Sequence, residues 1–174
     1  MRRFLLLALL CLATASAARA TDVDLAIGVR AFGSDHERWP EVGLGVRLGP
    51  DLWKLKPEVG LAIAEDPLYG GTLFEGSAGL GGDFPHVGRN AFDWGLGYAR
   101  LRYEIGANEG EADATYFRLG WRWVRPAAAD LGIAVRYLDG PDIVLRSGYE
   151  SSGEVDPGFR ESISTFVVSF RLRW

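Results

Sequence analysis

The chain ends on Phe166-Val-Val-Ser-Phe-Arg-Leu-Arg-Trp174, and this stretch is the clearest guide to how it folds. Successive side chains of a β-strand point to opposite faces. One face of this segment would carry Phe166, Val168, Phe170, Leu172 and Trp174, and the other would carry Val167, Ser169, Arg171 and Arg173. The segment therefore predicts a strand with one apolar face and one face that contains arginine.

Seven earlier segments alternate in the same way. We predict strands over residues 23–32, 42–48, 55–64, 72–80, 92–105, 115–124 and 131–138. Within residues 92–105 the apolar residues change phase near Ala99–Arg100, which predicts a β-bulge at that point. Together with the last segment this gives eight strands.

The second face of these strands is unusual because it is rich in glycine. It holds Gly28, Gly43, Gly45, Gly60, Gly79, Gly95, Gly97, Gly120 and Gly132. In a soluble barrel or sandwich this face would meet water and carry Lys, Thr, Glu and Ser. Small residues instead suit the crowded lumen of an eight-stranded barrel. We therefore predict an all-β fold, a transmembrane up-and-down antiparallel β-barrel of eight strands, with its apolar side chains facing lipid.

The glycine-rich face also carries charges, which we predict to form a lumenal network. Its members are Arg30, Arg47, Glu58, Glu75, Asp93, Arg100, Arg102, Arg118, Arg122, Arg136 and Arg171, and the same face holds Asp24, Glu104 and Arg173. The network has two interpretations: an anion-selecting pore, or a plug of arginine–carboxylate pairs. We favour the plug, because eight strands leave little room for water and buried charges must be paired.

The first 20 residues predict a secretory signal peptide that is removed. Arg2 and Arg3 precede an apolar run, and Ala18-Arg19-Ala20 resembles a cleavage site. Residues 21–174 then form one barrel domain. The only cysteine of the sequence, Cys11, would be removed with the signal peptide, and 16 basic and 23 acidic side chains would remain in the barrel domain. This acidic balance does not favour nucleic acid.

The overall pattern resembles that of bacterial outer-membrane β-barrel proteins. Short turns at 49–51 and 125–130 alternate with longer connections at 33–41, 65–71, 106–114 and 139–162. The resemblance implies export through the periplasm, an integral outer-membrane location, contact with outer-membrane lipids and lipopolysaccharide, and a monomer. It also implies that the barrel-assembly machinery recognises the C-terminal strand through Phe166, Val168, Phe170, Leu172 and Trp174.

Aromatic residues predict two girdles at the lipid–water boundaries. The periplasmic girdle would contain Trp53, Trp94, Trp121, Trp123 and Trp174, and the outer girdle Trp39, Tyr69, Phe74, Tyr103, Tyr116 and Tyr137. A local resemblance goes further. Trp123-Val-Arg-Pro126, Gly132 and Arg136-Tyr137-Leu-Asp139 are similar to the late strand–turn–strand part of YfaZ-type small outer-membrane proteins. That family implies a barrel with no established activity.

We predict no catalytic, cofactor or metal site. Asp35-His36-Glu37 and His86 fall in polar loops, where solvation is the commoner role. Lipid A deacylases of the PagL type are of similar size but carry a His–Ser pair late in the barrel, whereas residues 132–137 here contain no histidine. The expected role is therefore structural or surface-interacting and non-enzymatic. The alternatives are a narrow anion-preferring channel and a lipid A-modifying enzyme.

Overall fold

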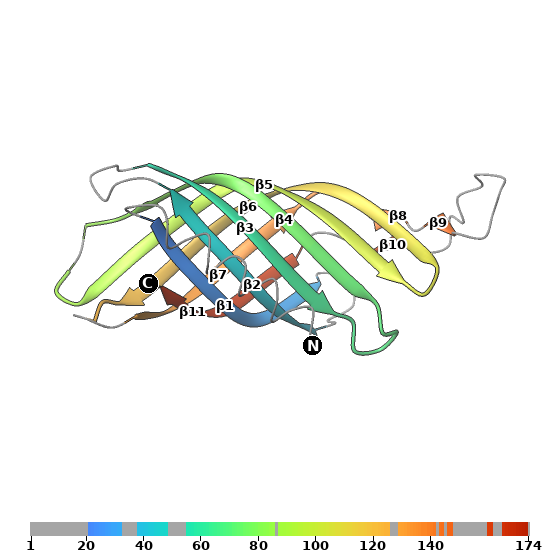
Figure 1. Ribbon diagram of the computed structural model, residues 1–174, viewed down its shortest axis with the longest axis horizontal. Helices are drawn as coiled ribbons and strands as arrows, with labels where there is room; N and C mark the ends of the chain where they lie inside the picture. The colour runs from blue at the N-terminus through green and yellow to red at the C-terminus, as the bar shows by residue number, and fades with distance from the viewer. Residues whose placement is uncertain are drawn as a thin grey trace.

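The computed structural model describes residues 21–32, 38–48, 55–85, 87–125, 129–141, 143–144, 146–147, 160–161 and 165–173. Within these ranges, no helix is long and apolar enough to cross a membrane. The described chain is instead built from β-strands, which run obliquely around a common axis (Figure 1).

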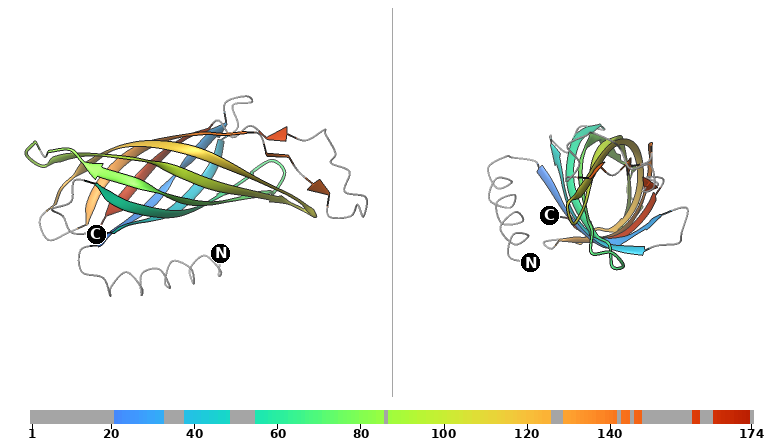
Figure 2. Two further views of the ribbon diagram at one scale, coloured as in Figure 1. Left: turned by 90° about the horizontal axis from the view of Figure 1, so that it is seen from above. Right: turned by 90° about the vertical axis from the view of Figure 1, so that its right-hand side faces the viewer.

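Eight long strands form one closed antiparallel sheet. They are β1 (Thr21–Phe32), β2 (Arg38–Leu48), β3 (Lys56–Glu65), β4 (Thr72–Asp83), β5 (Asn90–Ile105), β6 (Asn108–Trp123), β7 (Asp130–Asp139) and β11 (Thr165–Arg173). Each strand pairs with its neighbours in the chain, and β1 pairs with β11, so the sheet has no free edge along its length. The view along the axis shows the resulting ring (Figure 2). The predicted eight-stranded barrel is confirmed.

Three two-residue strands lie beyond one end of the barrel, in the segment between β7 and β11 (Figure 1). Of these, β8 (Ile143–Val144) pairs with β10 (Arg160–Glu161), and β9 (Arg146–Ser147) pairs with the start of β6. The pairing of β8 with β10 extends the last hairpin above the barrel. The long connection between β7 and β11 lies at this end, which we call the outer end, and we call the opposite end the periplasmic end.

The strands are strongly staggered. We can start at Ala26 and step each time to the residue paired with it on the next strand. The path through β2, β3, β4 and β5 reaches Ala112 on β6. Partners followed the other way, through β11 and β7, arrive at Arg122, which lies ten residues further along β6 (122 against 112). A closed sheet with such a stagger must tilt its strands, typically by about 35–45°, against the barrel axis. The narrow, tilted barrel fits the geometry expected of a membrane-spanning sheet.

The apolar face of the sheet points outward. Leu61 is 48% exposed and Phe170 is 71% exposed, and Val46 also lies on the outer face. Charged side chains on this outer face of the described strands lie at the outer end. They form a ring of Arg38, Glu65, Arg100, Asp113 and Asp139, and Arg102, Glu104, Glu109 and Glu111 lie further out on the β5–β6 hairpin. An apolar band bounded by charges is the exterior of a transmembrane barrel.

Two predictions about β5 and β6 were wrong. The β4–β5 pairing is continuous from Asp83–Asp93 to Thr72–Glu104, so β5 has no bulge near Ala99–Arg100. Residues 106–114 are also not a long loop, because β6 begins at Asn108 and a two-residue turn joins it to β5. Gly106 opens this turn with a φ of 58°, a conformation that favours glycine.

The predicted outer girdle is wrong for three of its six members. Trp39, Tyr103 and Tyr116 are buried inside the barrel rather than exposed around it. The other three are exposed, as expected: Tyr69, Phe74 and Tyr137. In the periplasmic girdle Trp121 and Trp123 are exposed and Trp94 is partly exposed, while Trp53 and Trp174 lie outside the described residues.

Candidate functional site

The lumen contains a ring of four charged side chains, each of which lies in the outer half of its strand. Arg30 of β1 donates to Glu41 of β2 at 2.7 Å, and it also donates to Glu75 of β4. Arg136 of β7 donates to Glu75 at 2.6 Å and to Glu41 at 3.0 Å. We call these four residues the upper ring. It joins β1, β2 and β7 to β4 across the lumen.

The upper ring balances its own charge, since it holds two arginines and two glutamates. Arg30 and Glu75 have side-chain exposures of 1% each. Charges removed from water to this degree must be paired and hydrogen-bonded, because an isolated buried charge is very unfavourable. The ring therefore depends on each of its members.

A second and larger group of charges fills the periplasmic half of the lumen, with Asp93 of β5 at its centre. The Asp93 carboxylate lies 2.9 Å from Arg47, 3.4 Å from Arg118 and 3.7 Å from Arg122 and Arg173. Its other members are the carboxylates that complete the pairs: Asp24, Glu58, Asp83 and Asp130. We call this group the lower cluster.

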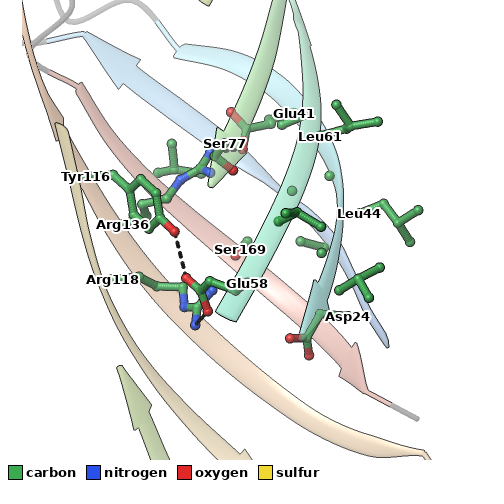
Figure 3. Close-up of a pocket in the computed structure, with 18 of the residues that line it drawn as sticks. Asp24, Glu41, Leu44, Glu58, Leu61, Ser77, Tyr116, Arg118, Arg136 and Ser169 are labelled. Carbon is green, nitrogen blue, oxygen red and sulfur yellow. Dashed lines mark hydrogen bonds and ion pairs between the residues drawn. The ribbon is translucent and has the colours of Figure 1, made fainter. Parts of the chain in front are cut away.

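Glu58 links the lower cluster to the wall formed by β6. It accepts hydrogen bonds from the Tyr116 hydroxyl at 2.8 Å, from Arg118 at 2.8 Å and from Arg47 at 3.2 Å. Figure 3 shows Tyr116 and Arg118 pointing across the lumen toward Glu58, whereas Leu61, on the same strand as Glu58, points to the other side of the sheet.

Glycines on the lumenal face make room for these carboxylates. A Cβ at Gly95 would lie 2.4 Å from a carboxylate oxygen of Glu58, and a Cβ at Gly120 would lie 2.7 Å from one of Asp93. Real Cβ atoms do not approach other atoms this closely. The glycine-rich face of the sequence and the charge network are thus two parts of one packing arrangement.

A small cavity lies between the upper ring and the lower cluster. Its volume is about 80 Å³, which is room for a few water molecules. Its lining combines charged side chains and Tyr116 with small and apolar residues. The charged residues are Asp24, Glu41, Arg47, Glu58, Arg118 and Arg136, the small ones include Gly43, Gly45, Gly60, Ser77 and Ser169, and the apolar ones include Leu44, Val46, Val59 and Leu61. The cavity is small and has charged side chains on both sides of it.

Above the upper ring the lumen is filled by apolar side chains. The ring centroids of Phe32 and Trp39 are 4.4 Å apart, and those of Trp39 and Tyr103 are 5.3 Å apart. Leu101 and Leu138 are fully buried in the same cluster. The Tyr103 hydroxyl donates to Asp66 at 2.8 Å in the β3–β4 connection. This apolar layer closes the outer end of the lumen.

A closed eight-stranded barrel with an apolar exterior and a filled lumen is the architecture of a small bacterial outer-membrane protein. The structure is similar to Neisserial surface protein A (NspA). The TM-score is 0.65 at 11% sequence identity, and the alignment covers 88% of this chain and 94% of the NspA chain. At this identity the likeness to NspA establishes the fold. No protein-family model matches the chain, and no curated protein matches it.

The structure places most of the expected network residues in the lumen. They are Arg30, Arg47, Glu58, Glu75, Asp93, Arg118, Arg122 and Arg136, joined by Asp24 and Arg173. Arg100, Arg102 and Glu104 are instead on the outer surface, because the alternation of β5 continues without a bulge. The side chain of Arg171 lies outside the described part of the chain.

The misplaced arginines belong to an exposed ladder on the outer face of the β5–β6 hairpin. Arg100 donates to Glu111 at 2.5 Å, and Arg102 contacts Glu104 at 2.8 Å and Glu109 at 2.6 Å. Hydrogen bonding and charge from Arg100 lower the pKa of Glu111, which lies outside the membrane-spanning part of β6. We call these five residues the outer ladder.

Four lumenal partners were missed from the sequence: Glu41, Asp83, Tyr116 and Asp130. Glu41 lies on the same face of its strand as Gly43, and Asp83 on the same face as Gly81. Both residues lie beyond the strand ends that we predicted. Longer strands would have included both. Tyr116 was assigned to the girdle because it is aromatic, although its parity is that of Arg118.

Of the expected C-terminal signal residues, Val168 and Phe170 are exposed on the outer face and Leu172 is partly exposed. The side chain of Phe166 and the whole of Trp174 lie outside the described residues, as do His36 and His86. Among the residues that are described, no group of three or more His, Cys, Asp or Glu side chains could hold a metal ion.

Proposed function

We propose that this protein is a monomeric, non-enzymatic outer-membrane barrel with a structural or surface-interaction role, in contact with outer-membrane lipids and lipopolysaccharide. The observation that carries the proposal is the filled lumen. Arginine–carboxylate pairs occupy its periplasmic half and middle, and packed aromatic and aliphatic side chains occupy its outer part. The cavity between them has a volume of only about 80 Å³, and the interior of an eight-stranded barrel is just wide enough for its own side chains.

Planar-bilayer recording tests this proposal against the anion-channel alternative. Purified protein whose folding is verified by heat-modifiable gel mobility should give no discrete conductance steps. Reproducible steps with a reversal potential that favours anions would replace the proposal by the channel. The enzyme alternative is tested separately, by mass spectrometry of lipid A from cells with and without the protein. An unchanged lipid A profile is expected, and a new species would support an enzyme.

We further propose that the barrel-assembly machinery recognises the C-terminal strand. Val168, Phe170 and Leu172 support this, since β11 presents them on the outer face of the barrel. Phe170→Ser should lower the amount of folded protein in the outer membrane of cells but leave refolding of the purified chain into detergent unchanged. Ile133→Ser, which removes an exposed apolar side chain opposite Phe170 on β7, is the matched control. Equal losses for the two variants in cells would argue against recognition of the terminal strand.

A further inference from the structure

The membrane-facing surface carries a hollow of about 820 Å³ near the outer end, which we call the β4 groove. It crosses β2 to β6, and its exterior lining is formed by Leu44, Val46, Val59, Leu61, Gly76, Ala78, Tyr98, Arg100 and Asp113. Gly76 and Ala78 of β4 are its floor, because their neighbours in register are larger: Leu61 and Arg100 beside Gly76, and Val59 and Tyr98 beside Ala78. Its volume is within the ~300–1,000 Å³ range of ligand pockets.

Packing inside the protein does not require the glycine on this floor. A Cβ at Gly76 would have Leu61 Cδ2 as its nearest neighbour, 3.9 Å away. Gly79, on the lumenal face of the same strand, differs sharply, because a Cβ there would lie 2.2 Å from the Leu96 carbonyl oxygen. A glycine within a strand weakens it and often marks a place where a ligand approaches closely. Gly76 therefore points to an occupant outside the barrel.

The outer end of the groove is charged. Arg100 lies beside Gly76 in register, at the ring of charges that bounds the apolar band, and its side chain is 68% exposed. One of its nitrogens donates to Glu111, and a guanidinium has five N–H donors in all. Asp113 lies opposite Arg100 on β6 and also lines the groove. The groove thus joins an apolar trough to a cation and a hydrogen-bond acceptor.

Two other hollows of the outer surface lack this combination. One lies over β6, β7, β11 and β1 and is lined by apolar side chains such as Trp121, Ile133 and Phe170. The second is lined by Phe84, Phe92, Leu119 and neighbouring residues. Neither opens onto an exposed charged side chain of the ring. Bulk hydrocarbon chains suffice to fill such surfaces, whereas the β4 groove also suits an anionic headgroup.

We propose that the β4 groove binds one acyl chain of a phosphorylated, acylated glucosamine lipid of the lipid A type, with a phosphate at Arg100. Such a lipid supplies hydrocarbon for the trough, a phosphate for the guanidinium, and hydroxyl or amide donors for the Asp113 carboxylate. This inference rests on the proposed contact with outer-membrane lipids and adds a site and a chemistry to it.

Native mass spectrometry of the detergent-purified, full-length mature protein tests the trough. The probes are bisphosphorylated lipid A, the same lipid without phosphate, and phosphatidylethanolamine. Wild type should retain one bisphosphorylated lipid A in preference to the other two. Gly76→Leu should lower this retention by about tenfold, because the new side chain occupies the floor. Val29→Phe adds bulk to an exposed, lipid-facing site outside the groove and should have no effect.

The headgroup contact is tested with Arg100→Gln. This variant should lose the preference for phosphate, by about tenfold, while it keeps the dephosphorylated lipid as well as wild type does. Arg102→Gln makes the same charge change one step further out on the outer ladder and should retain the preference. An equal loss in both variants would indicate general attraction to the charged hairpin and would overturn the site.

The outcomes separate the site from the proposed function. If wild type retains no lipid A above phosphatidylethanolamine, the proposed lipopolysaccharide contact and the site both fail. If wild type retains lipid A and Gly76→Leu does so equally well, the site is wrong and the contact stands. A lipid-free dimer that Gly76→Leu dissociates would show that a second copy of this chain occupies the groove, which also overturns the lipid proposal.

Discussion

Arginine–glutamate pairs occur both in the lumen of this barrel and on its outer surface, which differ in their access to water. In the upper ring, Arg30 and Glu75 are almost completely buried. In the outer ladder, the side chains of Arg102 and Glu109 are 48% and 59% exposed. The chemistry is the same, but a buried charge that loses its partner cannot be solvated, whereas an exposed one returns to water and is screened by salt. The burial of such a pair therefore determines how much its loss would reduce the stability of the barrel.

Strand β5 passes through both environments. Toward the periplasmic end it places the charged Asp93 inside and the apolar Leu96 outside. Toward the outer end it places the apolar Tyr103 inside and the charged Arg102 outside. The backbone alternates throughout, and the surroundings of the two faces exchange where the strand leaves the membrane. We therefore expect substitutions of charged residues in the lumen to lower the stability of the barrel more than substitutions in the outer ladder.

Replacing Glu75 by Gln should have the largest effect on stability. It leaves Arg30 and Arg136 with one carboxylate between them, Glu41, and so creates an uncompensated buried charge. We expect the free energy of unfolding to fall by about 3–5 kcal/mol, measured by urea titration of protein folded in detergent micelles or lipid vesicles.

The double variant Glu75→Gln, Arg136→Gln is the control for this change, because it restores neutrality in the upper ring. It should lose less stability than the sum of the two single variants. Strict additivity would show that the two charges do not depend on each other, and the contrast with the outer ladder would then lose its basis.

The sequence was sufficient to predict the number of strands, the direction of their apolar faces and most of the lower cluster. For example, Arg118 and Arg122 share the parity of Gly120, and that face is inside. It was misleading at Leu101 and Tyr103. Their apolar phase suggested a bulge, because an outward apolar face was assumed along the whole strand. In fact the outer part of the lumen is itself apolar, so the pattern inverts without any change in the backbone.

The two glycines of β4 sharpen the contrast between lumen and exterior within one strand. Gly79→Ala should destabilise the barrel by about 1–3 kcal/mol, because its Cβ would collide with the backbone of β5. Gly76→Ala should be neutral or stabilising by about 0.5–1 kcal/mol, because its Cβ has room and alanine restricts the unfolded chain. Urea midpoints of the two variants measure the difference. Similar losses at both positions would contradict the assignment of Gly76 to the lipid side.

Tyr116→Phe should have a smaller effect than Glu75→Gln. It removes the hydroxyl that donates to Glu58, but Arg47 and Arg118 continue to donate to the same carboxylate. We expect a loss of about 1.5 kcal/mol, the lower end of the range for a hydrogen bond to a charged group. Thermal unfolding of the folded band on unboiled gels gives an independent reading. An unchanged melting temperature would mean that the Tyr116 hydroxyl is satisfied elsewhere, for instance by water in the adjoining cavity.

The outer ladder should respond least. Glu109→Gln removes one partner of Arg102, yet Glu104 remains within 2.8 Å of the same guanidinium and solvent reaches all three side chains. The pair is already screened at physiological ionic strength, so the urea midpoint should stay within error of wild type. Repeating the titration at low salt provides the decisive comparison, because screening is then weak and any contribution from the pair should become visible. A loss as large as that of Glu75→Gln under both conditions would mean that the hairpin is buried in the assembled membrane, and the two regions would no longer differ in kind.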